Sequence, residues 1–272
     1  MEKFNYEEKI WGANKVRATP FYLGALRIKY ALSALRLVRK ATPGRIKLLE
    51  VGCGGGGMAK AIKYYRPDIE VYACDVSKRA INEADKNPEG VNFKVGNVYS
   101  LPFGNSQFDA VLAFDLFEHL EKIENAIKET RRVLKKGGIL HFYSPVEGEV
   151  CSYIKWLDML SIRLKENFTG HIQRFTINSL RKIVEKEGFR VIAQKKSGYL
   201  IYQFFDMAYF SFLTLRRKNI GYALETLVEK KKNPTLYLLK AALKVVAILN
   251  YLESSILQKA TGIGVHLSCM KK

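Results

Sequence analysis

Cysteine is scarce in this sequence, and the few present are far apart. No two of them form a C-x-x-C pair, and they lack the dense spacing of a disulfide framework. We therefore expect neither a zinc site built from cysteines nor structural disulfides. The four cysteines are Cys53, Cys74, Cys151 and Cys269.

Long uncharged apolar runs are also missing. The first residues, MEKFNYEEKIWG, are charged and contain no apolar stretch of the kind found in a secretory signal. The two most apolar segments, 199–215 and 235–257, are too short or carry charges, whereas a membrane span needs about 20 predominantly apolar residues. We expect a cytoplasmic protein, with peripheral attachment to the inner face of the membrane as an alternative placement.

Acidic residues are outnumbered. Lys and Arg total 45 against 26 Asp and Glu, which gives a net charge of +19 in 272 residues. Such an excess indicates an anionic partner, which can be a nucleic acid, an acidic membrane surface or a polyanionic substrate. It says nothing about the fold.

The excess charge is unevenly distributed. Residues 1–46 and 197–260 carry net charges of +7 and +5, so these 110 residues hold most of the surplus, while residues 47–196 carry only +5. The sequence predicts four parts on this basis: an N-terminal helical cap over 1–46, a core over 47–196, a basic apolar-aromatic helical insertion over 197–260, and a last core strand within 261–272.

The core alternates short apolar runs with helical patterns. Strands separated by helices imply right-handed crossovers and a parallel sheet covered on both faces. The predicted fold class is therefore α/β, a doubly wound, mostly parallel seven-stranded sheet. The predicted strands are 47–51, 69–74, 91–95, 108–114, 139–144, 189–194 and 264–270.

A glycine-rich loop follows the first strand. Gly52, Gly54 and Gly57 fit G-x-G-x-x-G, which permits a tight turn and a close approach of the backbone to a ligand. Asp75, at the end of the second strand, can accept hydrogen bonds from two ribose hydroxyls. Together they indicate an adenosine-containing ligand, either a dinucleotide or S-adenosylmethionine. Glu50 favours S-adenosylmethionine, because a buried carboxylate repels the pyrophosphate of a dinucleotide and suits an ammonium group.

At this point a family resemblance is clear over about residues 46–196 and the last strand. The segment LLEVGCGGGG resembles motif I, (E/D)xGxGxG, of the class I methyltransferases that use S-adenosylmethionine. VYACDVS resembles their second-strand motif. VGNVYSLPFGNSQFDAVLAFDLFEHL, RRVLKKGGILHFYSP and HIQRFTINSLRKIVEKEGF are similar to later motifs of the family, in that order.

The resemblance implies roles for individual residues. It assigns Glu50, Gly52 and Gly54 to the methionine end of the cofactor, with Cys53 in the same loop as a small space-filling residue. It assigns Asp75 to the ribose. It further implies that Val76 packs on the adenine, that Asn97 and Val98 read its edge, and that Phe114 lines the methyl-transfer cleft. The family usually has Asp where this chain has Asn97, and an Asn side chain can still pair with adenine.

Methyl transfer from a sulfonium depends mostly on alignment and on exclusion of water, so a dedicated base is optional. Two histidines are catalytic candidates: His171, in a loop where relatives contact substrate, and His119, in the turn after the fourth strand. For His119 the alternative is a cap at a helix N-terminus. His141 lies mid-strand and is expected to be a core residue. We find no metal-ligand constellation in the sequence and expect no metal.

The two attachments have open roles. The helical segment Phe21–Val38 is expected to cover the cofactor and shape the acceptor pocket, as in the family. The insertion fits a helix pair in a membrane interface or a lid over a long apolar substrate, and equally a helical subdomain or dimer surface. Nucleic-acid binding is disfavoured, because the aromatic residues are clustered among aliphatic ones.

The sequence thus predicts a methyltransferase dependent on S-adenosylmethionine, acting on a small hydrophobic or lipid-like acceptor, with oxygen preferred as the methylated atom. The alternatives are an RNA methyltransferase and a regulatory protein that binds S-adenosylmethionine without turnover. An anionic membrane surface is a further expected partner, and the oligomeric state stays open.

Overall fold

The computed structural model describes residues 7, 10–13, 16–22, 24–38, 45–160, 162, 169–216 and 234–272. Parts of the predicted N-terminal cap and of the predicted insertion, including the basic triplet 230–232, lie outside the described residues.

Seven strands form one sheet in the order β3-β2-β1-β4-β5-β7-β6. All neighbouring strands run parallel except β7, which is antiparallel to both β5 and β6. This confirms the predicted fold class. The strands are β1 (Lys47–Val51), β2 (Glu70–Asp75), β3 (Val91–Val95), β4 (Phe108–Phe114), β5 (Leu134–Pro145), β6 (Phe189–Ser197) and β7 (Gly264–Lys271).

The fifth strand is longer than predicted. It begins at Leu134, five residues earlier than expected, and runs through Gly137 and Gly138. The pairing of β4 with β5 shifts register between Phe108 and Ala110. The two glycines therefore mark an irregularity inside the ladder rather than its start.

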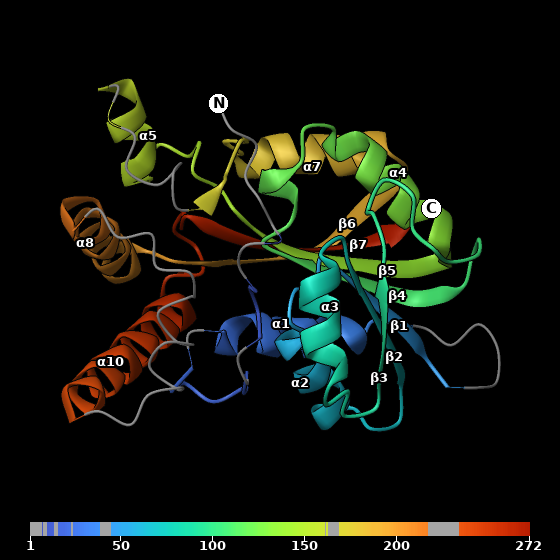
Figure 1. The fold of residues 1–272 in the computed structure, drawn as a ribbon. Helices are drawn as coiled ribbons and strands as arrows, with labels where there is room; N and C mark the ends of the chain where they lie inside the picture. Colours follow the sequence, from blue (N-terminus) through green and yellow to red (C-terminus); the bar gives the residue numbers. More distant parts are fainter. Residues whose placement is uncertain are drawn as a thin grey trace.

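Helices cover both faces of the sheet (Figure 1). Apolar side chains of α1 and α2 pack on one face, and those of α4 and α7 pack on the other. The helices of these layers are α1 (Ala25–Leu35), α2 (Gly57–Tyr65), α3 (Lys78–Asp85), α4 (Ile123–Val133) and α7 (Ile177–Lys186). Ser77 caps α3, because its hydroxyl accepts from the backbone N–H of Ala80 at 3.1 Å. Helix α1, which comes from the predicted N-terminal cap over 1–46, is therefore one of the helices that pack on the sheet.

Three further helices, α5 (Tyr153–Met159), α8 (Leu200–Arg216) and α10 (Pro234–Ile256), lie at the end of the sheet where the parallel strands finish (Figure 1). They are tied together by polar contacts. The Tyr153 hydroxyl donates to Asp206 at 2.6 Å, which joins α5 to α8. The backbone N–H of Ile201 donates to Glu253 at 3.0 Å, which joins α8 to α10. Among the described helices, none is long and apolar enough to cross a bilayer.

Candidate active site at the carboxyl ends of the strands

The glycine loop requires glycine for two physical reasons. Gly52 and Gly54 adopt φ values of +70° and +51°, which side-chain-bearing residues rarely adopt. A Cβ on Gly54 would lie 2.3 Å from the carbonyl oxygen of Trp11, and one on Gly52 would lie 2.9 Å from the side chain of Leu116. The loop is therefore held between the N-terminal segment and the turn after β4.

Two backbone donors of this loop are already used by the chain. Gly55 donates to the carbonyl of Trp11, and Gly57, the first residue of α2, donates to the carbonyl of Gly12, both at 2.7 Å. A dinucleotide site uses such N–H groups at a helix N-terminus to hold its pyrophosphate. Because the carbonyl groups of Trp11 and Gly12 occupy them here, the loop suits an adenosine ligand that has no phosphate.

Glu50 is buried in β1, with 2% of its surface exposed. It accepts a hydrogen bond from the backbone of Ala59, while its Oε2 has no hydrogen-bond partner among the described residues. Burial raises the pKa of Glu50 to about 8, and the negative charge of Asp75 adds to the shift. A buried carboxylate oxygen without a donor is costly, and a cationic ligand group would remove that cost.

Asp75 ends β2 beside the same loop. Its two carboxylate oxygens accept from the backbone N–H groups of Gly54 at 2.8 Å and Ser77 at 2.9 Å. Burial nevertheless raises its pKa. Val76 follows with 54% of its surface exposed, so an apolar face is open next to the carboxylate.

The remaining predicted cofactor residues lie after β3, at the end of β4 and in the glycine loop. Asn97 is exposed after β3, and its side-chain oxygen accepts from the backbone N–H of Tyr99 at 2.9 Å, while Val98 is half-buried. Phe114 ends β4 and is buried. Cys53 is buried too, and burial holds its pKa well above the ordinary value, so the thiol stays neutral and fills space. The role of each in binding stays a prediction.

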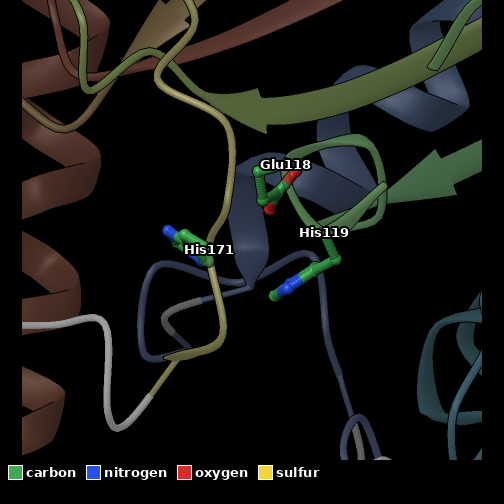
Figure 2. A group of neighbouring side chains, drawn as sticks. All are labelled: Glu118, His119 and His171. Atoms are coloured by element: carbon green, nitrogen blue, oxygen red, sulfur yellow. The ribbon is translucent and has the colours of Figure 1, made fainter. Parts of the chain in front are cut away.

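A group that the sequence analysis missed lies beyond Phe114. Glu118 and His119 belong to the 3-10 helix η1 (Phe117–His119), and His171 comes from the segment before α7 (Figure 2). The ligand atoms of the three side chains lie within 4.8 Å of one another. The sequence analysis did not predict this grouping, and the expectation that the chain binds no metal stays untested. No short spacing motif links His119 to His171, so sequence alone gave no signal.

His119 does not cap a helix. Helix α4 begins without a side-chain cap, and Nδ1 of His119 lies 3.1 Å from the carbonyl oxygen of Gly170. Burial lowers the pKa of His119 to about 4, with a further contribution from His171. The imidazole is thus neutral at physiological pH.

His141 is a core residue, as expected. It is buried, its Nδ1 lies 2.9 Å from the hydroxyl of Ser268, and burial lowers its pKa to about 3. Its ring stacks on that of His266 with centroids 5.6 Å apart. His266 is also buried, and neither of its ring nitrogens has a hydrogen-bond partner within the described part of the chain.

The sheet order, the glycine loop at the end of β1 and the acid at the end of β2 define a class I methyltransferase fold. Residues 49–142 match the family model described as "Methyltransferase domain". The chain therefore carries a methyltransferase domain of the class that depends on S-adenosylmethionine.

Known proteins agree with this class. The chain is 26% identical over 179 residues to the demethylmenaquinone methyltransferase of Thermotoga maritima, covering 60% of this chain and 77% of that protein. It is 29% identical over 164 residues to the ubiquinone biosynthesis O-methyltransferase of Pelagibacter ubique, covering 57% and 67%. The solved structure of the 4+2 cyclase SpnF superposes with a TM-score of 0.56 at 21% identity, over 90% of this chain and 81% of that one. Similarity at that level concerns the fold alone.

Proposed function

We propose that this protein transfers the methyl group of S-adenosylmethionine to an oxygen atom of a small hydrophobic or lipid-like acceptor. The observation that carries the cofactor assignment is the buried Glu50. Its Oε2 has no hydrogen-bond partner among the described residues and suits the ammonium of the methionine moiety. Asp75 would hold the ribose, and Val76 would pack on the adenine.

The acceptor class is supported by the surroundings of the strand ends. Helices α5 and α8 expose large apolar side chains there, among them Trp156, Met159, Leu200 and Phe204, each more than half exposed. Exposed apolar surface of this kind marks contact with apolar ligands, partners or membranes. Two relatives named for quinone methylation point in the same direction, and the name of one specifies oxygen.

The reaction needs little from the protein beyond alignment. The acceptor oxygen forms a bond to the methyl carbon, the carbon–sulfur bond breaks, and its electron pair remains on sulfur to give S-adenosylhomocysteine. Proximity and orientation supply most of the rate. His119 and His171 lie on the turn after β4 and on the segment beside it, where the acceptor would sit, and their contact with the acceptor stays a prediction.

The test uses S-adenosylmethionine labelled in the methyl group. Purified protein is incubated with extracted lipid and quinone fractions and, separately, with total RNA. We expect label in the lipid or quinone fraction, together with S-adenosylhomocysteine formation that depends on that fraction. Label confined to RNA would establish the RNA alternative, and tight cofactor binding without any acceptor-dependent turnover would establish the regulatory alternative. Either result overturns the proposal.

A further inference from the structure

The group of Glu118, His119 and His171 has the composition of a metal site. Two imidazoles and one carboxylate form the ligand set of several catalytic zinc and iron centres. Here the rings of the two histidines meet edge to face with centroids 5.0 Å apart, and all three ligand atoms lie within 4.8 Å of one another. Figure 2 shows the three side chains coming from two separate segments.

Both histidines are oriented by a second layer of acceptors. Nδ1 of His119 lies 3.1 Å from the Gly170 carbonyl, and Nδ1 of His171 lies 3.2 Å from a carboxylate oxygen of Glu147. Glu147 is itself buried and accepts from Arg174 at 2.8 Å. Metal-binding histidines usually donate from one nitrogen to a carbonyl or carboxylate, which fixes the tautomer that presents the other nitrogen's lone pair.

Glu118 supplies an independent indication of a cationic ligand. Its side chain is fully buried, and one oxygen accepts from the Ser144 hydroxyl at 3.0 Å, whereas the other, Oε1, has no hydrogen-bond partner among the residues that the structure describes. A bound cation would offset the cost of this buried carboxylate.

The group also lies next to the cofactor loop. Leu116, two residues before Glu118, packs so closely over Gly52 that a Cβ on the glycine would be 2.9 Å from it. Gly52 belongs to the loop assigned to the methionine end of the cofactor. A ligand held at Glu118 would therefore lie near the loop assigned to the methionine end of the cofactor.

We propose that Glu118, His119 and His171 bind a divalent transition-metal ion that coordinates the acceptor oxygen. The role of the metal rests on the proposed methyl transfer, whereas its binding does not. Three protein ligands leave coordination positions open for substrate. The metal would fix the acceptor hydroxyl and favour loss of its proton to solvent. The oxygen then takes the methyl group, and the sulfur keeps the bonding electron pair.

The test is direct metal binding, measured without any acceptor. Untagged protein is treated with chelator and titrated with Co²⁺, while visible absorption reports coordination and elemental analysis gives the stoichiometry. We expect one ion per chain, with visible bands that lack thiolate charge transfer, which would separate this site from exposed Cys151.

Three variants and one matched control test the ligands. Glu118→Gln, His119→Gln and His171→Gln are each expected to weaken Co²⁺ binding by at least about a hundredfold. Glu147→Gln, which removes an orienting group, is expected to weaken it by about 10–100-fold. Glu121→Gln changes an exposed acid three residues from Glu118 and should leave binding unchanged.

Far-UV circular dichroism and S-adenosylmethionine binding check that each variant is folded. Absence of Co²⁺ binding by the wild-type protein, or equal binding by wild type and the folded Glu118→Gln variant, would overturn the metal site. Neither result would affect methyl transfer as such, because the cofactor loop and its binding are measured separately. Conversely, metal binding without transfer to any lipid fraction would leave the site standing and remove the proposed reaction.

Discussion

Glu50 is the residue on which the choice of cofactor depends. Sequence reasoning placed a carboxylate inside β1, and the structure adds that it is buried with an unpartnered oxygen in the described surroundings. A phosphate-bearing ligand would keep this carboxyl protonated and would find the N–H groups of Gly55 and Gly57 already occupied. An ammonium group favours the ionised carboxylate and then meets a complementary charge.

This residue predicts a pH dependence of cofactor affinity. The folded protein without ligand holds a proton on Glu50 up to about pH 8, against an ordinary pKa of 4.5. Fold stability from this group is therefore present at low pH and lost as pH rises through about 8. Binding of an ammonium favours the ionised carboxylate, so binding releases a proton below pH 8. Affinity for S-adenosylmethionine should rise by up to about tenfold per pH unit towards pH 8.

Calorimetry in buffers of different ionisation enthalpy measures both the slope and the released proton. Glu50→Gln keeps the size of the side chain and removes the titration, so its affinity should be lower at pH 8 and nearly independent of pH. A wild-type affinity that does not change between pH 6 and 8, or an equal slope in the variant, would contradict the assignment of Glu50 to the ammonium.

At the residue scale, sequence reasoning located residues whose place in the fold follows from backbone geometry, and their roles in binding stay predictions. The positions of Gly52, Gly54 and Asp75 follow from a loop that must turn tightly at the end of a strand. It failed for the grouping of His119 and His171, because their proximity is created by the path of the segment before α7, and no local spacing records it. Glu118 was seen only as part of a family motif, and its complete burial is a property of the tertiary structure.

Helix α8, which belongs to the apolar-aromatic insertion, has one buried side and one exposed apolar side. Gln203, Phe210 and Leu213 are buried towards the protein, whereas Leu200 and Phe204 are 76% and 62% exposed. With Met207, these last two recur at helical spacing and form a stripe on one side of the helix. Burial of part of the helix supports a packed subdomain, and the exposed stripe supports contact with an apolar surface.

We expect this stripe to insert into a membrane interface. Replacement of Leu200, Phe204 and Met207 by serine removes apolar groups whose burial contributes about 1.5–3 kcal/mol each. Sedimentation with vesicles should therefore show binding weakened by at least about tenfold per substitution, with cofactor affinity unchanged. Tyr64→Ser, which removes an equally exposed aromatic ring from α2, is the matched control and should bind as wild type does. Equal losses in both variants would argue against a dedicated stripe.

The first and last residues of strands were predicted well where the strands are buried on both faces of the sheet. The apolar runs of β1 and β4 coincide with the predicted segments because neighbouring strands enclose them. The start of β5 was missed because Leu134–Gly138 contains two lysines and two glycines, a composition typical of a turn, and only pairing with β4 makes it extended.

At the scale of the whole molecule, most of the excess of basic residues lies outside the part of the chain to which the reaction is assigned. The core over 47–196 has nearly balanced charge, and the surplus lies in the segments that supply α1, α8 and α10. These helices meet at the carboxyl ends of the strands, where Lys29 of α1 donates to Tyr251 of α10 at 2.9 Å. Basic residues and apolar side chains thus occur in the same segments of the chain, which fits a membrane interface with anionic head groups.

The charge predicts a salt dependence that the apolar stripe does not. Each basic residue near an anionic bilayer contributes about 1 kcal/mol, and this attraction is screened over about 8 Å at physiological salt and about 3 Å at 1 M. Binding to vesicles that contain anionic lipid should therefore fall by at least about tenfold between about 0.05 and 0.5 M salt, and neutral vesicles should bind weakly throughout. The serine variant of α8 should keep the same salt slope at lower affinity, because it alters only the apolar contribution. Binding that is insensitive to salt would assign the basic surplus to another partner, and competition by RNA with transfer of label to RNA would identify that partner as nucleic acid.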